Sequence, residues 1–311
     1  MPFLRSGNLD MIVLRSILGL LFIASAVLKL MSIDEFELFV FKWSQLGWDV
    51  STLISRLLVV WEFFLGAALV LGIRSRLSAK LSVATLVGFT LLLGALIVLG
   101  ENENCQCFGK YVDLDPKESI VKNILLFIGF VVLLRFSKTN SIRFRVWCWP
   151  LFVVSFITVA VVSPPDFLLN NRYDPTGVKM DIERVALEKA IVYQKTEVGF
   201  DTAYSGKQIW MFISHSCSMC KKSAMKMAAI QLREDKSLPV SMFIMGTDTT
   251  KYEAFMQETK IDEYPTYFME GPSFLEYTKQ LPTIFLVADK KVVSSYGYRT
   301  FNERSVLDFM E

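Results

Sequence analysis

Five apolar stretches in the first half of the chain constrain its fold more than any other feature. A helix that crosses the hydrocarbon core of a bilayer needs roughly 20 predominantly apolar residues. Hydrophobic residues make up 52% of the 311-residue chain, which is too high for an ordinary water-soluble protein of this length. The pattern therefore predicts five membrane-spanning helices. They cover Met11–Met31, Leu53–Ile73, Ala79–Leu99, Ser119–Phe136 and Val146–Val162.

The charges of the loops between these spans predict the orientation of the helices. Short loops that are rich in Lys and Arg stay in the cytoplasm. The loop after the second span carries Arg74, Arg76 and Lys80, and the loop after the fourth carries Arg143 and Arg145. The loop after the third span is acidic overall. We therefore expect a five-pass protein of the bacterial inner membrane, with a cytoplasmic N-terminus and with the acidic loop and the C-terminal segment in the periplasm.

The chain changes character after the fifth span. Pro164-Pro165 marks the exit from the membrane, because paired prolines cannot continue a helix. We expect a four-span membrane domain over residues 1–145, a fifth helix over 146–163, a linker over 164–200 and an α/β domain over 201–311. In the linker, Asp181–Lys189 is a candidate short helix. The predicted strands of the α/β domain are Gln208–Ser214, Val240–Met245, Thr283–Ala288 and Lys291–Tyr296, and its predicted helices are Ser218–Arg233, Thr250–Thr259 and Asn302–Met310.

A cysteine pair, Cys217-Ser-Met-Cys220, lies where the first of these strands passes into a helix. The first cysteine of such a pair lies at a helix N-terminus, where unpaired N–H groups and the helix dipole stabilise a thiolate. We therefore expect Cys217 to be the nucleophile and Cys220 the buried resolving thiol. The alternatives are a static disulfide or half of a zinc site. Zinc would need two further ligands, and His215 is the only histidine in the chain.

From Gly206 to Glu311 the chain resembles the thioredoxin-like family, in particular its membrane-anchored, exported members. Beside the cysteine pair, the resemblance rests on Leu281-Pro282-Thr283 and the strand that follows. In that family the matching proline is cis and faces the cysteines, so the resemblance implies that Leu281, Pro282 and Thr283 dock the substrate. Pro282 is favoured over Pro265 because no clear strand follows Pro265. His215-Ser216 replace the Trp that the family has before the first cysteine, and His215 either tunes the Cys217 thiolate or caps a strand end.

A second pair, Cys105-Gln-Cys107, lies in the acidic loop between two spans and is followed by Phe108-Gly109. A disulfide between residues so close in sequence needs a bent backbone, because the Cα atoms of bonded cysteines lie within about 6.8 Å. Strained disulfides are more oxidising, so a redox role fits this pair. The alternative is two free or separately bonded thiols.

Residues 10–135 resemble the DoxX/MauE-type four-span membrane proteins. The resemblance rests on Ala24–Leu30 in the first span, Glu62 with Gly66 in the second, and the Cys-Gln-Cys-Phe-Gly loop. That loop is similar to the one in the methylamine-utilisation members, which are implicated in forming disulfides in an exported dehydrogenase subunit. The resemblance implies a role in the redox maturation of exported proteins.

Ionisable residues within spans are costly and are candidates for function. Lys29 lies in the first span, and Arg56 and Glu62 lie in the second. We expect Lys29 or Arg56 to pair with Glu62 beneath the Cys105–Cys107 loop. The pair is either structural or part of a quinone or proton site. The remaining cysteine, Cys148, is expected to be a buried apolar residue.

These features together predict a membrane thiol–disulfide oxidoreductase in which Cys105/Cys107 exchange electrons with Cys217/Cys220 and oxidise exported client proteins. No further cysteine pair is present to conduct electrons outward, so oxidation is favoured, with a membrane quinone as the candidate acceptor. We expect no metal and no nucleic-acid partner. The alternative is a non-catalytic, membrane-anchored assembly factor or a copper- or client-binding chaperone, in which four methionines supply soft ligands. These are Met211, Met219, Met225 and Met227.

Overall fold

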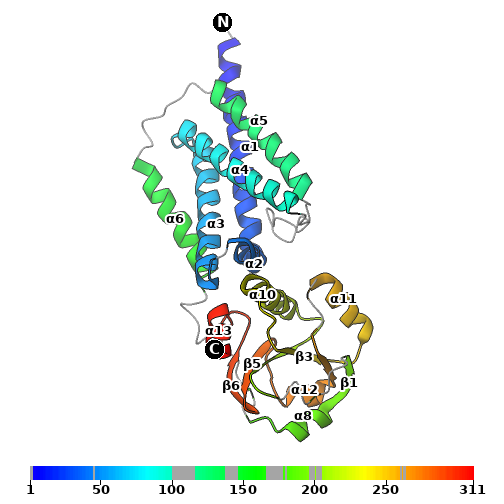
Figure 1. Cartoon of the computed structure of the whole chain (residues 1–311). Coiled ribbons are helices and arrows are strands. Elements are labelled where there is room, and N and C mark those ends of the chain that lie inside the picture. Colours follow the sequence, from blue (N-terminus) through cyan, green and yellow to red (C-terminus); the bar gives the residue numbers. More distant parts are fainter. Residues whose placement is uncertain are drawn as a thin grey trace. The chain divides into compact units, whose positions relative to one another are not determined.

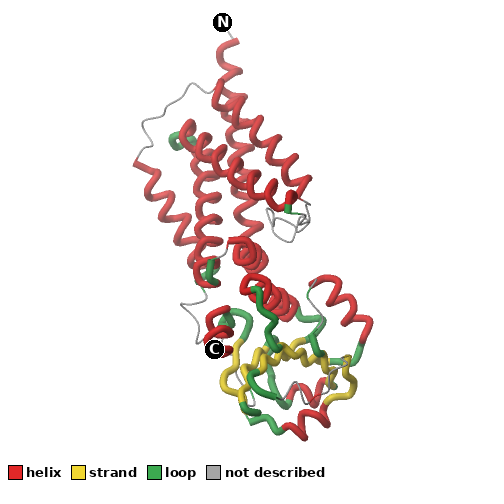
Figure 2. The backbone as a smooth tube through the Cα atoms, viewed as in Figure 1, coloured by secondary structure: helices red, strands yellow, loops and turns green. Residues whose placement is uncertain are grey.

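The computed structural model describes residues 3–44, 46–99, 116–136, 146–165, 178, 181–195, 200, 205–259, 261 and 264–311. The chain divides into two compact units. Unit 1 comprises Met1–Val40 and Thr52–Pro164, and unit 2 comprises Phe41–Ser51 and Pro165–Glu311. Helices make up unit 1, whereas unit 2 combines helices with a sheet (Figure 2).

Four of the described helices are long and apolar enough to cross a membrane. They correspond to the first four predicted spans. The fifth predicted span forms a helix of 15 residues, which at 1.5 Å per residue is shorter than the hydrocarbon core of about 30 Å, so the five-pass topology stays a prediction. In chain order, the helices up to this point are α1 (Phe3–Met31), α2 (Ile33–Ser44), α3 (Trp48–Leu71), α4 (Ser75–Val98), α5 (Pro116–Phe136) and α6 (Cys148–Val162) (Figure 1).

Helix α2 was not predicted, because it is too short and too charged to resemble a span. Asp34 and Glu35 lie in its first turn and Lys42 lies in its last. These charges interact favourably with the helix dipole at both ends and stabilise the helix. Phe36 and Phe41 are buried on it. The helix is amphipathic, with apolar residues recurring at a period of 3.6 residues. This periodicity is the sequence signal for α2, and it does not produce a long apolar run.

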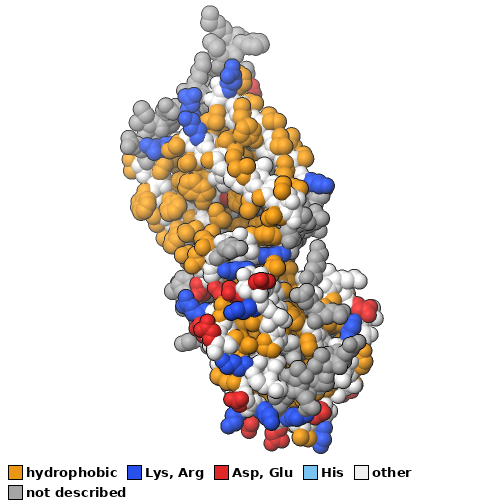
Figure 3. All heavy atoms as spheres, viewed as in Figure 1, with side chains coloured by type: hydrophobic (Ala, Val, Ile, Leu, Met, Phe, Trp, Pro, Cys, Tyr) orange, Lys and Arg blue, Asp and Glu red, His pale blue; other side chains and the backbone are white. Residues whose placement is uncertain are grey.

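The core of unit 1 forms where α1, α3, α4 and α5 pack together. Leu18, Phe22, Leu65 and Phe130 are buried in one cluster, and the rings of Phe22 and Phe130 meet edge to face at 5.6 Å between centroids. On the outside, large apolar side chains are exposed along the same helices, and hydrophobic side chains cover much of the visible face of unit 1 (Figure 3). An apolar exterior of this kind suits contact with lipid.

Helices α1 and α3 approach each other closely at two glycines. A Cβ atom on Gly19 would lie 2.7 Å from the carbonyl oxygen of Gly66, and a Cβ atom on Gly66 would lie 2.7 Å from that of Gly19. Small residues at such crossings let helix backbones pack tightly within a membrane. Each glycine is therefore required by the backbone of the opposite helix.

Unit 2 is built on a six-stranded mixed sheet with the strand order β1-β4-β3-β2-β5-β6. The central strand β2 runs parallel to β3 and antiparallel to β5, and every residue of β2 is buried. The strands are β1 (Ile191–Lys195), β2 (Gln208–Ile213), β3 (Val240–Met245), β4 (Thr266–Met269), β5 (Thr283–Ala288) and β6 (Lys291–Tyr296). The helices are α8 (Arg184–Ala190), α10 (Ser218–Glu234), α11 (Thr249–Thr259), α12 (Gly271–Leu275) and α13 (Glu303–Met310).

Aromatic side chains fill one face of this sheet. The ring of Phe212 stacks on that of Phe243 at 4.7 Å between centroids, and Phe243 stacks on Tyr267 at 5.1 Å. Phe274 and Phe285 also contact the ring of Phe212. These contacts join four strands and α12 around one core, so the strand that leads to Cys217 is held rigidly.

The observed strands and helices of unit 2 match the predicted ones closely, except that β4, β1 and α12 were not predicted. Helix α8 overlaps the candidate short helix Asp181–Lys189. Strand β4 follows Pro265, where no strand was expected, because its four residues are too short a run to stand out. Strand β1 and helix α8 lie within residues 164–200, which were predicted to be a linker, and β1 pairs with β4. The sheet therefore begins before residue 201. The side chains of β1 are mostly exposed, so no alternating pattern marked it as a strand.

Residues Phe41–Ser51 pack within unit 2. The backbone N–H of Trp48 donates to the carboxylate of Glu303 at 2.8 Å. The ammonium group of Lys226, which is fully buried, lies 3.3 Å from the ring centroid of Trp48. It also donates to the carbonyl oxygens of Tyr298 and Phe301. A buried charge needs such partners, since its desolvation is otherwise very unfavourable.

We expect Gly66→Ala to lower the stability of unit 1, because the new methyl group must displace the backbone of α1. Overpacking of this kind costs about 1–3 kcal/mol. Thermal unfolding of the detergent-solubilised full-length protein, followed by loss of the monodisperse peak, measures the effect. Gly94→Ala on α4 is the matched control, since a Cβ atom there meets nothing within 4 Å and both variants gain the same helix propensity. Equal melting temperatures for the two variants would show that the glycine crossing does not constrain the fold.

Candidate functional site

The cysteine pair lies at the junction of β2 and α10. Strand β2 ends at Ile213, and Cys217 is the N-cap residue of α10, with its Sγ accepting the backbone N–H of Cys220 at 3.3 Å. The backbone N–H of Ser214 donates to Sγ of Cys220 at 3.4 Å. This junction places the first sulfur at the positive end of the helix dipole.

The two thiols have opposite electrostatic environments. The hydrogen bond from the Cys220 thiol, together with backbone N–H groups of Cys220 and Met219, lowers the pKa of Cys217 from 9.0 to about 6, although partial burial opposes the shift. Burial raises the pKa of Cys220 far above its ordinary value, and the hydrogen bond that it donates to Cys217 adds to the rise. Cys220 is fully buried, whereas Cys217 is partly exposed. At neutral pH Cys217 is therefore the nucleophile and Cys220 the protonated partner.

The predicted substrate-docking residues lie at the same end of the sheet. The peptide bond between Leu281 and Pro282 is cis. Phe212 pairs with Thr283 across strands β2 and β5, so continuing this register places Pro282 beside the last residue of β2, close to where the cysteine segment begins. The hydroxyl of Thr283 donates to the carbonyl oxygen of Gln280 at 2.8 Å. The segment before β5 is thereby tied down next to the site.

The surroundings of the pair are mostly polar. Nδ1 of His215 lies 2.9 Å from the hydroxyl oxygen of Ser216. Burial lowers the pKa of His215, and Lys251 and Lys221 lower it further against the opposing effect of Asp248, so the imidazole is neutral at pH 7. Lys221 forms an ion pair with Glu258, which reduces its effect on the thiolate. The role of His215 in tuning Cys217 stays a prediction.

The structure bears on the predicted methionine ligands but not on the predicted loop cysteines. Cys105 and Cys107 lie outside the described residues. Met211 on β2 and Met227 on α10 are buried in the core of unit 2. Methionines on a strand and an adjacent helix are commonly core residues. Among the residues that the structure describes, no three His, Cys, Asp or Glu side chains are grouped to hold a metal ion. Cys148 is the first residue of α6 and is partly buried.

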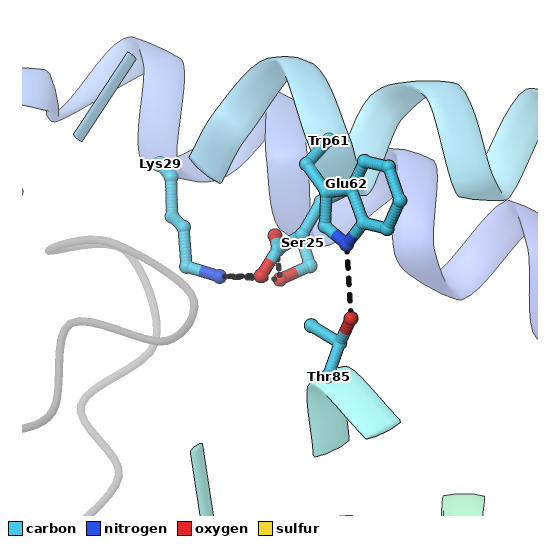
Figure 4. Close-up of polar contacts among 5 residues, drawn as sticks. All are labelled: Ser25, Lys29, Trp61, Glu62 and Thr85. Atoms are coloured by element: carbon cyan, nitrogen blue, oxygen red, sulfur yellow. Dashed lines mark hydrogen bonds and ion pairs between the residues drawn. The ribbon is translucent and has the colours of Figure 1, made fainter. Parts of the chain in front are cut away.

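A second polar cluster lies inside unit 1. The ammonium group of Lys29 is 2.5 Å from the carboxylate of Glu62, and the hydroxyl of Ser25 lies 3.2 Å from each of these two side chains (Figure 4). Lys29 and Glu62 are exposed by only 2% and 4%. Beside them, the indole N–H of Trp61 donates to the hydroxyl oxygen of Thr85 at 3.0 Å. Of the two pairings that the sequence allowed for Glu62, the structure has the one with Lys29.

Arg56, the other candidate partner of Glu62, pairs elsewhere. Arg56 forms an ion pair with Glu37 of α2, a residue that the sequence analysis did not single out. Its guanidinium also donates to the carbonyl oxygens of Ser163 at 2.9 Å and Pro164 at 3.0 Å. Arg56 therefore joins α2 and α3 to the end of α6. Glu37 is a carboxylate on the otherwise apolar face of the amphipathic helix α2. This interruption was the only sequence signal that Glu37 has a buried partner.

A cavity in unit 1 opens onto the Lys29–Glu62 pair. Lys122 and Asn123 of α5 also line it, and the Asn123 amide donates to the hydroxyl of Thr90 at 3.1 Å. The rule that flagged Lys29, a charge within a predicted span, applies equally to Lys122, which the sequence analysis passed over because it lies near the start of its span. The described residues that line the cavity are Leu21, Phe22, Ser25, Lys29, Glu62, Thr85, Leu86, Phe89, Lys122, Asn123 and Leu126.

Residues 8–136 match the family model described as methylamine utilisation protein MauE. This match confirms the MauE part of the resemblance drawn from residues 10–135, and the DoxX part stays a prediction. A curated relative, Protein TlpB of Flavobacterium psychrophilum, is 22% identical and aligns with 95% of this chain and 93% of its own length. The alignment therefore extends across both units of this chain.

Solved structures resemble the C-terminal part. StoA from Bacillus subtilis is 17% identical, with 34% of this chain and 83% of that chain covered and a TM-score of 0.28. The thioredoxin domain of a thiol-disulfide oxidoreductase from Bacteroides vulgatus is 14% identical, with 39% and 96% covered and a TM-score of 0.31. The thioredoxin-like fold of unit 2 follows from its own features: a central strand leading to Cys-x-x-Cys, parallel β3, and antiparallel β5 after a cis-proline.

The alkylation rate of reduced Cys217 should rise with pH through a midpoint of about 6, because only the thiolate reacts and its fraction grows as the proton is lost. Cys220→Ala removes the thiol that donates to Cys217, so its midpoint should move upward, towards 9.0. Iodoacetamide labelling of full-length protein that lacks Cys105, Cys107 and Cys148, read by mass spectrometry from pH 4 to pH 10, measures both midpoints. A midpoint near 9 in the parent protein would contradict the geometry of the N-cap.

Arg56→Met should destabilise unit 1 strongly, because it leaves the carboxylate of Glu37 buried beside an apolar side chain. Removing one partner of a buried ion pair costs about 3–5 kcal/mol. The double variant Arg56→Met/Glu37→Gln removes the charge as well and should recover much of the loss. Melting temperatures of the two purified variants in detergent make the comparison. If the double variant is no more stable than Arg56→Met, the ion pair is not the source of the effect.

Proposed function

We propose that this protein is a membrane-bound thiol–disulfide oxidoreductase that oxidises exported proteins. The observation that carries the proposal is the pairing of a half-exposed, low-pKa thiol at Cys217 with the buried, protonated thiol of Cys220 at the N-terminus of α10. This asymmetry suits disulfide exchange, in which one sulfur is attacked and the other stays sheltered until it resolves the intermediate. A static structural disulfide would not require this difference in pKa and burial between its two sulfurs.

The reaction begins with the Cys217–Cys220 disulfide. A client thiolate attacks Sγ of Cys217, forming a mixed disulfide and releasing the Cys220 sulfur as a thiolate, which takes up a proton. A second client thiolate then attacks the client sulfur of that mixed disulfide and releases Cys217 as the low-pKa thiolate. The client gains a disulfide, and the pair has accepted two electrons. Because a low pKa makes Cys217 a good leaving group, release of the oxidised client is favoured.

We infer that Cys105 and Cys107 reoxidise this pair. The reduced Cys217 thiolate attacks the Cys105–Cys107 disulfide, and Cys220 then attacks Cys217 to close the original disulfide and leave two thiols in the loop. Those thiols pass two electrons and two protons to a membrane quinone. The chain holds five cysteines, and Cys148 is the only one outside the two pairs, so no third pair is available to bring electrons from the cytoplasm. This favours oxidation of clients.

The exchange requires both pairs on one side of the membrane. The Lys and Arg residues in the loops after the second and fourth spans favour a cytoplasmic location for these loops. With five crossings, the Cys105–Cys107 loop and unit 2 would then lie in the periplasm of a bacterial cell. The 15-residue α6 would complete the fifth crossing with the help of flanking residues. Trp147 and Trp149, exposed by 59% and 72% at its start, are of the type that anchors helices at membrane interfaces.

Thiol trapping in intact cells tests the relay. In cells that express the parent protein, Cys217 and Cys220 should be mostly oxidised, whereas Cys105→Ser/Cys107→Ser should leave them reduced. Cys148→Ser is the matched control and should leave them oxidised. If the state of the soluble pair does not change when the loop cysteines are removed, then unit 1 serves as an anchor and another protein oxidises unit 2.

A further inference from the structure

Lys29, Ser25 and Glu62 form a closed set of hydrogen bonds at the wall of the cavity in unit 1. The ammonium group of Lys29 donates to Oε1 of Glu62 at 2.5 Å and to the hydroxyl oxygen of Ser25 at 3.2 Å. That hydroxyl in turn donates to Oε2 of Glu62 at 3.2 Å (Figure 4). The two charged groups are therefore joined twice, once directly and once through Ser25.

These bonds do not use the full hydrogen-bonding capacity of the pair. An ammonium group has three N–H donors, and an ionised carboxylate has about four acceptor positions. Among the described residues, Lys29 donates to two oxygens, and each oxygen of Glu62 accepts one hydrogen bond. The rings of Phe36 and Phe89, with centroids 5.5 Å and 5.0 Å from the ammonium nitrogen, attract its charge but offer no oxygen acceptor. A small molecule that both accepts and donates would complete the set.

The cavity beside the pair has the size and the polarity of a water site. Its volume is about 30 Å³, which has room for about two water molecules, since roughly 10–15 Å³ holds one. A buried water also needs about two to four polar partners, and an apolar cavity of the same size would stay dry. Thr85 of α4 and Asn123 of α5 line the cavity together with Ser25 and the ion pair, so polar partners are present.

We propose that this cavity is a water-binding site, in which bound water accepts the remaining N–H of Lys29 and donates to the carboxylate of Glu62. Taking two opposite charges out of water is costly, and their attraction offsets that cost only when their other donors and acceptors are satisfied. Lipid tails cannot form hydrogen bonds, whereas water can do so on both sides of the pair. The bound water thus solvates the ion pair among apolar helices. The site does not rest on the thiol chemistry of either cysteine pair.

Hydroxyl-radical footprinting tests for this water, because X-ray radiolysis of a bound water molecule oxidises the side chains beside it. Full-length protein in nanodiscs is irradiated, and the oxidation of each phenylalanine is measured by mass spectrometry. Phe22 lines the cavity and is exposed by only 5%, whereas Phe127 of α5 does not line it and is exposed by 39%. We expect oxidation of Phe22 above the unirradiated background and none of Phe127, which lipid covers. Oxidation of Phe22 that does not exceed that of Phe127 would overturn the proposal.

A variant that fills the cavity locates the water. Leu126 lines the cavity, so Leu126→Phe should displace the water without altering any charge, and oxidation of Phe22 should fall to background. Ile128→Phe is the matched control, because it adds the same ring to the same helix at a position that is exposed by 53% and does not line the cavity. This control should leave the oxidation of Phe22 unchanged.

A second variant removes the charges and keeps the side-chain volumes. Replacing a buried ion pair by apolar residues of similar size is often neutral or stabilising, so Lys29→Met/Glu62→Leu should fold even if Leu126→Phe overpacks the helices. The less polar cavity should no longer hold water, and oxidation of Phe22 should again fall to background. Loss of this oxidation in either variant, with Ile128→Phe unchanged, supports the site. Oxidation of Phe22 that persists in both variants would show that the ion pair does not hold the water.

Discussion

The contact of Cys220, through its thiol and its backbone N–H, with the sulfur of Cys217 is the interaction on which the chemistry of unit 2 depends. It exists because a fully buried central strand stops at Ile213 and a helix starts at Ser218. The four-residue connection brings the first sulfur onto the open end of the helix, where N–H groups have no partners within the helix. The same turn buries the second sulfur. One local geometry therefore produces both a stabilised thiolate and a protected thiol.

Unit 1 depends on a different constraint, which is the expense of placing charge among apolar helices. Each of its buried ionic groups has been given partners: Lys29 has Glu62 and Ser25, and Arg56 has Glu37 and backbone carbonyls. The two clusters differ in kind. Arg56 is enclosed by carbonyls at the ends of helices, as a structural tie would be, whereas Lys29 lines a cavity. The Arg56 cluster therefore ties helix ends together, whereas the Lys29 cluster borders a cavity.

The MauE match to residues 8–136 and the thioredoxin-like sheet of unit 2 give the molecule two parts with related chemistry. A membrane protein with a thioredoxin-like domain and two cysteine pairs has the components of a thiol–disulfide oxidoreductase. In the function that we propose, the soluble domain provides the surface for clients near Pro282, and the membrane domain carries the pair that recharges it. Neither part can supply both.

Much of this was determined by the sequence itself. Long apolar runs specify membrane helices because no other structure satisfies the backbone there, and the strand–Cys-x-x-Cys–helix order specifies the thiolate because the helix end is a local property. Tertiary structure decided the rest. Arg56 and Glu62 lie six residues apart on α3, a spacing at which side chains on one helix do not meet. That Glu62 meets Lys29, and that Lys122 lines the same cavity, depends on how α1, α3 and α5 rotate as they pack, which side-chain types within one helix do not encode. Strand β4 likewise exists only because its four residues find β3 on one side and β1 on the other.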